Sequence, residues 1–121
     1  MAGLGEGAWF TQLPWVLQQC QEKLGFAPYP GTVNVEVLPE DQLLWDQLKA
    51  RPGRIIEALE ASFCDAACYP ALIGGQVRGA AIVPHVPGYP ANKLELLAPV
   101  HVTAELGLNL GQEVAIEFDA A

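Results

Sequence analysis

The sequence has 121 residues, of which 51% are hydrophobic, enough to bury the core of one domain. Six Lys and Arg residues against 14 Asp and Glu residues give a formal net charge of −8, which excludes a general attraction to nucleic acid or to an anionic membrane surface. We therefore expect a single domain over residues 1–121. We also expect a cytoplasmic location, because the sequence contains neither a signal segment nor a run of about 20 apolar residues. The odd number of cysteines, three, agrees with reduced thiols.

The first half of the sequence predicts two helices with a strand between them. Apolar residues recur at helical spacing over residues 13–24, with Pro14 suited to the first turn and Gly25 to the position after the end. Residues 33–37 alternate valine with polar residues, which predicts a strand with one buried face. Residues 39–48 predict a second helix, and residues 54–60 are ambiguous between helix and strand.

The second half is richer in strand patterns. Residues 69–73 and 76–83 flank Gly74-Gly75, which is typical of a β-hairpin. Residues 84–92 contain three prolines and predict a loop, and residues 94–98 predict a short apolar strand. A short helix over 99–106, a turn at 109–111 and a last strand over 113–118 follow. This pattern indicates a mainly β fold with α insertions, of the small β-barrel kind.

Three groups of residues could carry chemistry. The glycine cluster within residues 3–8 offers free backbone N–H groups that can cradle phosphates, although a flexible terminus is the simpler interpretation. Thr32 and Asn34 lie two residues apart on a strand and so share a face. Two neutral oxygens suit Mg²⁺ when phosphates and water complete its shell, yet Pro30-Gly31 leading into a strand needs no such role.

Glu95 is the third, a single carboxylate inside an apolar run. It must be exposed, paired or functional, and a kinase needs a group that orients or deprotonates the acceptor hydroxyl. A zinc site is disfavoured, because the gap between Cys64 and Cys68 is not a zinc-knuckle spacing and no second tight pair exists.

These features occur in an order that resembles the archaeal CTP-dependent riboflavin kinases. The run Gly3-Leu4-Gly5-Glu6-Gly7-Ala8-Trp9-Phe10 is similar to that family's opening loop. The run from Lys23 to Val35, which includes Pro30-Gly31-Thr32-Val33-Asn34, is similar to its central motif nearly residue for residue. Residues 79–84, 89–90 and 94–99 resemble its C-terminal half, and residues 106–108 with Gly111 and Val114 complete the resemblance.

The resemblance implies a six-stranded cradle-loop barrel that transfers the terminal phosphate of CTP to the 5′-hydroxyl of riboflavin, giving FMN and CDP. It implies Mg²⁺ held by Thr32 and Asn34, and Glu95 as the catalytic residue beside the flavin, with Pro87 and Tyr89 also on the flavin side. The nucleotide would contact Gly3, Leu4, Gly5, Glu6, Gly7, Ala8, Val100, His101, Val102 and Thr103.

The sequence also departs from the family at several positions. Only Met1 and Ala2 precede the glycine loop, where the family usually has a strand, so we expect a barrel that lacks this strand and a homodimer that covers the open edge. Val86-Pro87 replaces a frequent Arg-Thr pair, and Val102-Thr103 replaces a frequent Leu-Arg pair. Two alternatives therefore stay open. One is a non-catalytic nucleotide-binding, flavin-binding or dimerising module, and the other is a kinase for another small hydroxyl compound.

Overall fold

The computed structural model describes residues 10–61 and 63–120, and its first regular element is the helix α2, Pro14–Lys23. Pro14 occupies the first turn, and Gly25 follows the end with a positive φ of 83°, as the sequence predicts. The helix buries Val16, Gln19 and Cys20. The predicted boundaries of 13–24 are confirmed to within one residue.

The segment after α2 leads through the Pro30-Gly31 turn into β1, Val33–Glu36. Its burial alternates as expected, with the valines half-buried and Asn34 and Glu36 exposed. A short 3-10 helix η1, Pro39–Asp41, and the helix α3, Gln42–Lys49, then follow in place of the predicted helix.

Within the described residues, six strands form one antiparallel sheet in the order β1-β5-β4-β3-β2, with β6 paired to β3. The hairpin predicted at Gly74-Gly75 joins β3 to β4, and both glycines have positive φ. The ambiguous segment 54–60 contains the three-residue strand β2, and the last strand is shorter than predicted. The bounds of the remaining strands are Arg54–Ile56 for β2, Ala66–Ile73 for β3, Val77–Pro84 for β4, Lys93–Leu97 for β5 and Ile116–Phe118 for β6.

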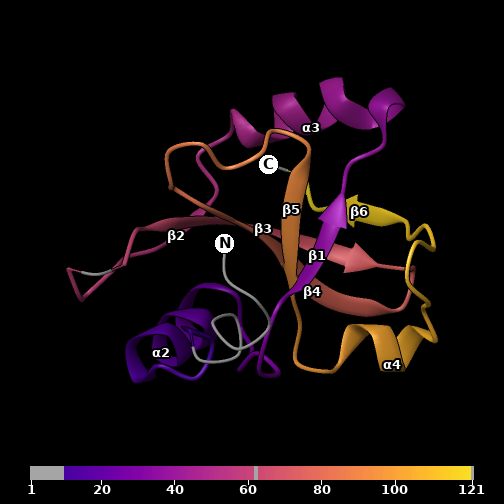
Figure 1. Cartoon of the computed structure of the whole chain (residues 1–121). Coiled ribbons are helices and arrows are strands. Elements are labelled where there is room, and N and C mark those ends of the chain that lie inside the picture. Colours follow the sequence, from indigo (N-terminus) through magenta and orange to yellow (C-terminus); the bar gives the residue numbers. More distant parts are fainter. Residues whose placement is uncertain (1–9, 62, 121) are drawn as a thin grey trace.

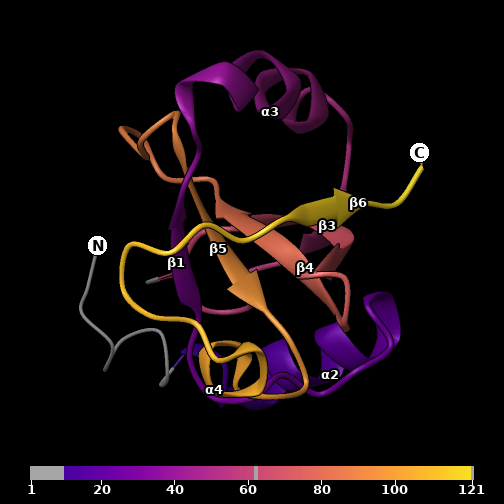
Figure 2. The ribbon, with the colours of Figure 1, turned by 90° about the vertical axis from the view of Figure 1, so that its right-hand side faces the viewer.

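The sheet curls because the long strand β3 has two neighbours along one edge. β2 pairs with its first half and β6 with its second half. Figures 1 and 2 show the resulting half-barrel, with α3 beyond one end of β1 and β5 and with α2 and α4, Val102–Leu106, at the opposite end. The predicted small β-barrel with helical insertions is confirmed in this form.

The two faces of the sheet pack into two separate apolar clusters. Alternate residues of β3 face opposite sides, so that Tyr69 and Ile73 join one cluster and Cys68 joins the other. The first cluster includes Trp45 and Leu48 of α3. The second is covered by Val16 and Cys20 of α2 and includes Leu97 of β5.

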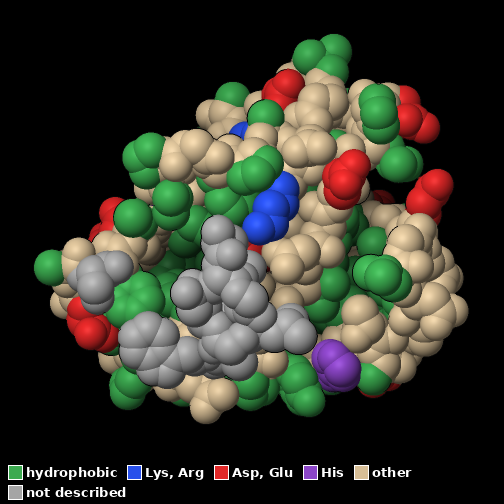
Figure 3. Space-filling model, in the orientation of Figure 1, with side chains coloured by type: hydrophobic (Ala, Val, Ile, Leu, Met, Phe, Trp, Pro, Cys, Tyr) green, Lys and Arg blue, Asp and Glu red, His purple; other side chains and the backbone are tan. Residues whose placement is uncertain are grey.

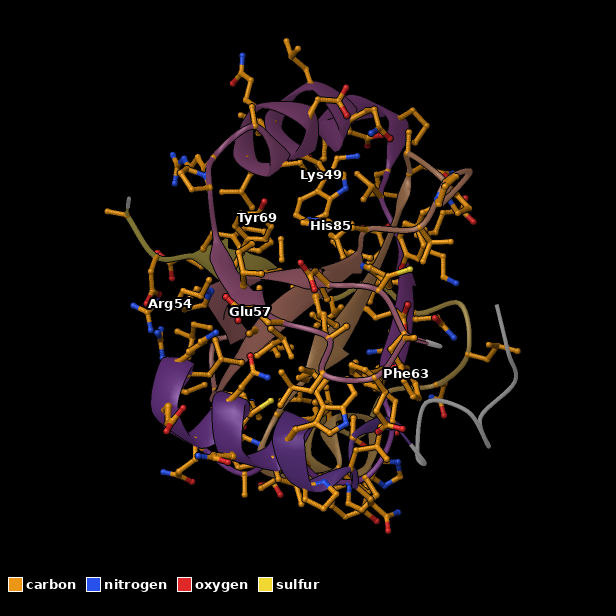
Figure 4. The ribbon with its side chains drawn as sticks, turned by 90° about the vertical axis from the view of Figure 1, so that its left-hand side faces the viewer. Lys49, Arg54, Glu57, Phe63, Tyr69 and His85 are labelled. Carbon is orange, nitrogen blue, oxygen red and sulfur yellow. The ribbon has the colours of Figure 1, made fainter. Side chains whose placement is uncertain are left out.

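Polar side chains fasten both helices to the sheet. The Tyr69 hydroxyl donates to the backbone carbonyls of Lys49 and Arg51, at 3.2 and 3.0 Å, and ties β3 to the end of α3. On the other side, the Gln19 side chain donates to the Glu57 carbonyl at 2.9 Å and accepts from the Glu57 N–H at 2.7 Å. Figure 4 shows Tyr69 on the α3 side and Glu57 on the α2 side.

Two expectations concern the surroundings of the sheet. In the part of the chain that the structure describes, β1 pairs with β5 alone, so the predicted homodimer stays a prediction. The expectation that the family's usual first strand is lacking concerns the chain before residue 10, which lies outside the described residues. The longest described helix has 10 residues, and no described helix is long and apolar enough to cross a membrane.

Candidate functional site

The pairing of β1 with β5 brings two of the predicted site residues together. The antiparallel register places Asn34 directly opposite Glu95, and residues opposite each other in such a pair point to the same face. Thr32 lies two residues before Asn34 and therefore shares this face. Its hydroxyl donates a hydrogen bond of 2.7 Å to Glu95 Oε1. Glu95 lies 61 residues after Asn34 in the sequence, and the pairing of β1 with β5 brings the two residues together.

Glu95 is buried, with 6% of its surface exposed. Its second oxygen, Oε2, accepts a 2.9 Å hydrogen bond from the Tyr89 hydroxyl. Burial raises the pKa of Tyr89, and the neighbouring Glu95 carboxylate and its hydrogen bond raise it further, so this hydroxyl keeps its proton and remains a donor. The structure excludes the exposed alternative for this carboxylate, because Glu95 is buried and accepts hydrogen bonds from two neutral hydroxyls.

A groove of about 470 Å³ opens beside the hydrogen-bonded pair of Thr32 and Glu95. Its volume lies in the range typical of small-molecule sites. Thr32 and Asn34 line it on one side, and all four of the predicted nucleotide contacts after residue 99 line it on the other. These contacts are Val100, His101, Val102 and Thr103.

Tyr29 belongs to the same groove, and sequence analysis did not single it out. Its ring stacks on the His101 ring with centroids 5.1 Å apart and planes 12° apart. Thr103 Oγ1 lies 3.1 Å from His101 Nε2, which links the imidazole to the start of α4. A tyrosine in a proline-rich turn carries no pattern that would mark it as a site residue.

The turn before β1 is held by backbone contacts. The Tyr29 N–H donates to the Ala98 carbonyl at 2.7 Å, and the Gly31 N–H donates to the Thr11 hydroxyl at 2.8 Å. Gly31 has a φ of 100°, a conformation that other residues rarely adopt. Glycine at position 31 therefore suits the turn that leads the chain to Thr32.

The chemistry of Thr32 and Asn34 fits a Mg²⁺ ion that a phosphate ligand also holds. The Thr32 hydroxyl donates its hydrogen bond to Glu95, so the lone pairs of its oxygen stay available, and Asn34 is exposed at the groove. Among the described residues no three His, Cys, Asp or Glu side chains gather as a cation site. Such a donor set supplies too few ligands alone and suits a cation shared with phosphates and water.

Two other predicted site residues, Pro87 and Tyr89, are not among the residues that line this groove. Pro87 is exposed in the loop between β4 and β5. The predicted phosphate loop at residues 3–8 lies outside the described residues. The three cysteines are free, with Cys20 and Cys68 buried and Cys64 exposed.

Comparison with known proteins places the chain in a family. The profile CTP-dep_RFKase, described as domain of unknown function DUF120, matches residues 1–118. The chain belongs to the CTP-dependent riboflavin kinase family. Curated archaeal riboflavin kinases are similar to this chain along almost the whole length of the chain.

Three relatives named riboflavin kinase illustrate the similarity. The chain is 32% identical over 121 residues to the protein of Methanosarcina barkeri, covering 98% of the chain and 53% of the relative. The protein of Methanosarcina acetivorans is 35% identical over 117 residues, which cover 94% of the chain and 49% of that relative. The protein of Methanococcoides burtonii is 37% identical over 125 residues, which cover 98% of the chain and 54% of that relative. The chain therefore spans about half the length of these riboflavin kinases.

Proposed function

We propose that this chain is a riboflavin kinase that transfers the terminal phosphate of CTP to the 5′-hydroxyl of riboflavin, giving FMN and CDP with Mg²⁺. The observation that carries the proposal is the buried Glu95 carboxylate beside Thr32, next to a groove lined by Asn34. Membership of the family and the names of the relatives support the reaction type and the acceptor.

In this proposal Glu95 orients the acceptor hydroxyl and accepts its proton. Each carboxylate oxygen already accepts one hydrogen bond, from Thr32 or Tyr89, and each has a second lone pair that an acceptor hydroxyl can use. The hydroxyl oxygen then forms a bond to the terminal phosphorus of CTP as the bond to the CDP oxygen breaks. Mg²⁺ would neutralise the phosphates, and Thr32 and Asn34 would hold it.

Positioning supplies most of the catalysis in phosphoryl transfer, which suits a chain with few cations. The stacked Tyr29 and His101 rings form one wall of the groove, where we place the nucleoside. Residues 3–8 are proposed to contact its phosphates. Tyr89 and Pro87 are proposed to lie on the flavin side, with Tyr89 fixed by its hydrogen bond to Glu95.

The test is a screen of CTP, ATP, GTP and UTP against riboflavin and other small alcohols, with mass detection of products. We expect FMN and CDP from CTP, riboflavin and Mg²⁺, and loss of at least 100-fold in turnover for Asn34→Ala. Asn34 is exposed, so this substitution is expected to leave the thermal unfolding temperature nearly unchanged. Absence of FMN with every nucleotide would rule out the kinase.

A further inference from the structure

A second hollow of about 360 Å³ adjoins the first groove at Asn34. Asn34 lines both, so the proposed metal ligand stands between two recesses on the same face. The first recess is lined by four of the residues proposed for the nucleotide, Val100, His101, Val102 and Thr103. The second is bordered by Pro90, which follows Tyr89 in the loop proposed for the flavin. The full lining of the second hollow is Asn34, Val35, Glu36, Pro90, Asn92 and Lys93.

Lys93 is the basic residue of this second hollow. It is the first residue of β5, two positions before Glu95, so the two side chains lie on the same face of the strand. Its Nζ atom lies 5.2 Å from the centre of the Tyr89 ring, whose hydroxyl donates to Glu95. The ring of Tyr89 thus contacts the ammonium group of Lys93, and the hydroxyl of Tyr89 contacts the carboxylate of Glu95.

The charge of Lys93 is not used in an ion pair within the described residues. Glu36 lies opposite it in the sheet register, yet the two side chains form no salt bridge. Four of the other five basic residues hydrogen-bond to oxygen atoms elsewhere, and the fifth, Arg51, follows the end of α3. Those four are Lys23, Lys49, Arg54 and Arg78.

The position of this free charge is unusual for so acidic a chain. The net charge is −8, and Figure 3 shows a basic side chain near the centre of the face that carries β1 and β5, with acidic side chains further out. A contact between an ammonium group and a tyrosine ring is weak at a partly exposed site. A phosphate oxygen is a stronger partner, because the hydrogen bond is then charged on both sides. The lysine stem is flexible enough to exchange one for the other.

We propose that Lys93 binds the phosphate group of the phosphorylated acceptor, and so distinguishes the product of the reaction from its alcohol substrate. The proposal rests on the proposed function, and it assigns the second hollow to the acceptor side of Asn34. Once Glu95 has released the proton that it accepts during transfer, the new phosphate monoester carries about two negative charges beside the Glu95 carboxylate. Lys93 supplies the cation that offsets this repulsion.

The experiment is a titration of riboflavin and FMN into the full chain, followed by flavin fluorescence, with CDP and Mg²⁺ absent. We expect Lys93→Gln to weaken FMN binding about tenfold, which corresponds to about 1.4 kcal/mol, and riboflavin binding less than twofold. Lys93→Arg is expected to retain most of the FMN affinity. Arg78→Gln is the matched control, because it removes the same charge from β4, where Arg78 forms an exposed ion pair with Asp119.

Each outcome decides a different point. Equal losses for riboflavin and FMN, or an unchanged FMN affinity in Lys93→Gln, would overturn the role of Lys93 while the wild-type protein still makes FMN. An equal loss in Arg78→Gln would reduce the effect to net charge and overturn it as well. A wild-type chain that neither binds flavin nor makes FMN would overturn the proposed function together with this inference.

Discussion

Replacing Glu95 by glutamine should separate catalysis from folding. The substitution keeps the shape of the side chain and removes its charge and one of its two acceptor oxygens. In the native site Thr32 donates to Oε1 at 2.7 Å and Tyr89 donates to Oε2 at 2.9 Å. A glutamine amide can still satisfy both hydroxyls, because one of them can rotate and accept from the new NH₂ group.

The expected change in stability follows from two opposing terms. Two charge-assisted hydrogen bonds become neutral ones, at a loss of about 1 kcal/mol each. Against this, a carboxylate that is 6% exposed no longer has to be desolvated, which for a buried ion costs several kcal/mol in the folded state. The terms nearly cancel, so we expect the free energy of unfolding to change by about 1–2 kcal/mol or less. For 121 residues this corresponds to a shift of roughly 3–8 °C in Tm.

The effect on turnover should be far larger. Loss of a positioned general base typically lowers the rate by about 10²–10⁴-fold. We would measure FMN formation from CTP and riboflavin together with thermal unfolding, for Glu95→Gln and for the control Glu117→Gln, which removes an exposed carboxylate from β6. Turnover within threefold of wild type would refute the catalytic role of Glu95. A Tm lowered by more than about 15 °C would instead show that the carboxylate is chiefly structural.

Three further predictions concern the packed core. Gly79→Ala should lower the free energy of unfolding by about 3 kcal/mol, because its Cβ would collide with the Leu97 carbonyl of the neighbouring strand, and an unchanged Tm would contradict this. A thiol reagent at pH 8 should label only Cys64 in the native protein, because Cys64 is exposed and the other two cysteines are buried. Burial raises the pKa of Cys20 from 9.0 to about 11, and it raises the pKa of Cys68 further. The stabilisation linked to the raised pKa of Cys20 is full below pH 9.0 and is lost as the pH rises towards about 11, which urea unfolding across this range would measure.

The local periodicity of the sequence predicted most of the regular elements. Alternating valines at residues 33–37 predicted β1, and Gly74-Gly75 predicted the β3–β4 hairpin. The pattern failed where an element is too short to show a period, as in the three residues of β2. It also extended the last strand to residue 113, although β6 begins only where Ile116 meets Ile73 on β3. Such limits are set by tertiary pairing rather than by local preference.

The candidate site could be named residue by residue, but its contacts could not be foreseen. Thr32 and Glu95 were singled out separately, and their hydrogen bond depends on a register between strands that are far apart in the sequence. The Tyr89 contact depends in turn on how the loop from β4 returns to β5. Neither depends on a short-range pattern, so only the folded sheet reveals that Glu95 is buried between two hydroxyls.

The burial of Glu95 is itself an argument for function. A buried carboxylate paired only with neutral hydroxyls stabilises a fold less than an apolar side chain of similar size would, because its desolvation is not repaid by a cation. Leu97 follows Glu95 by two residues, so it lies on the same face of β5, and it packs in an apolar cluster. Lys93 lies two residues before Glu95 on the same face of β5, and its charge is unpaired within the described residues. A strand that keeps an acid buried and a base unpaired, both against one tyrosine, is better explained by a ligand that uses both than by the stability of the sheet.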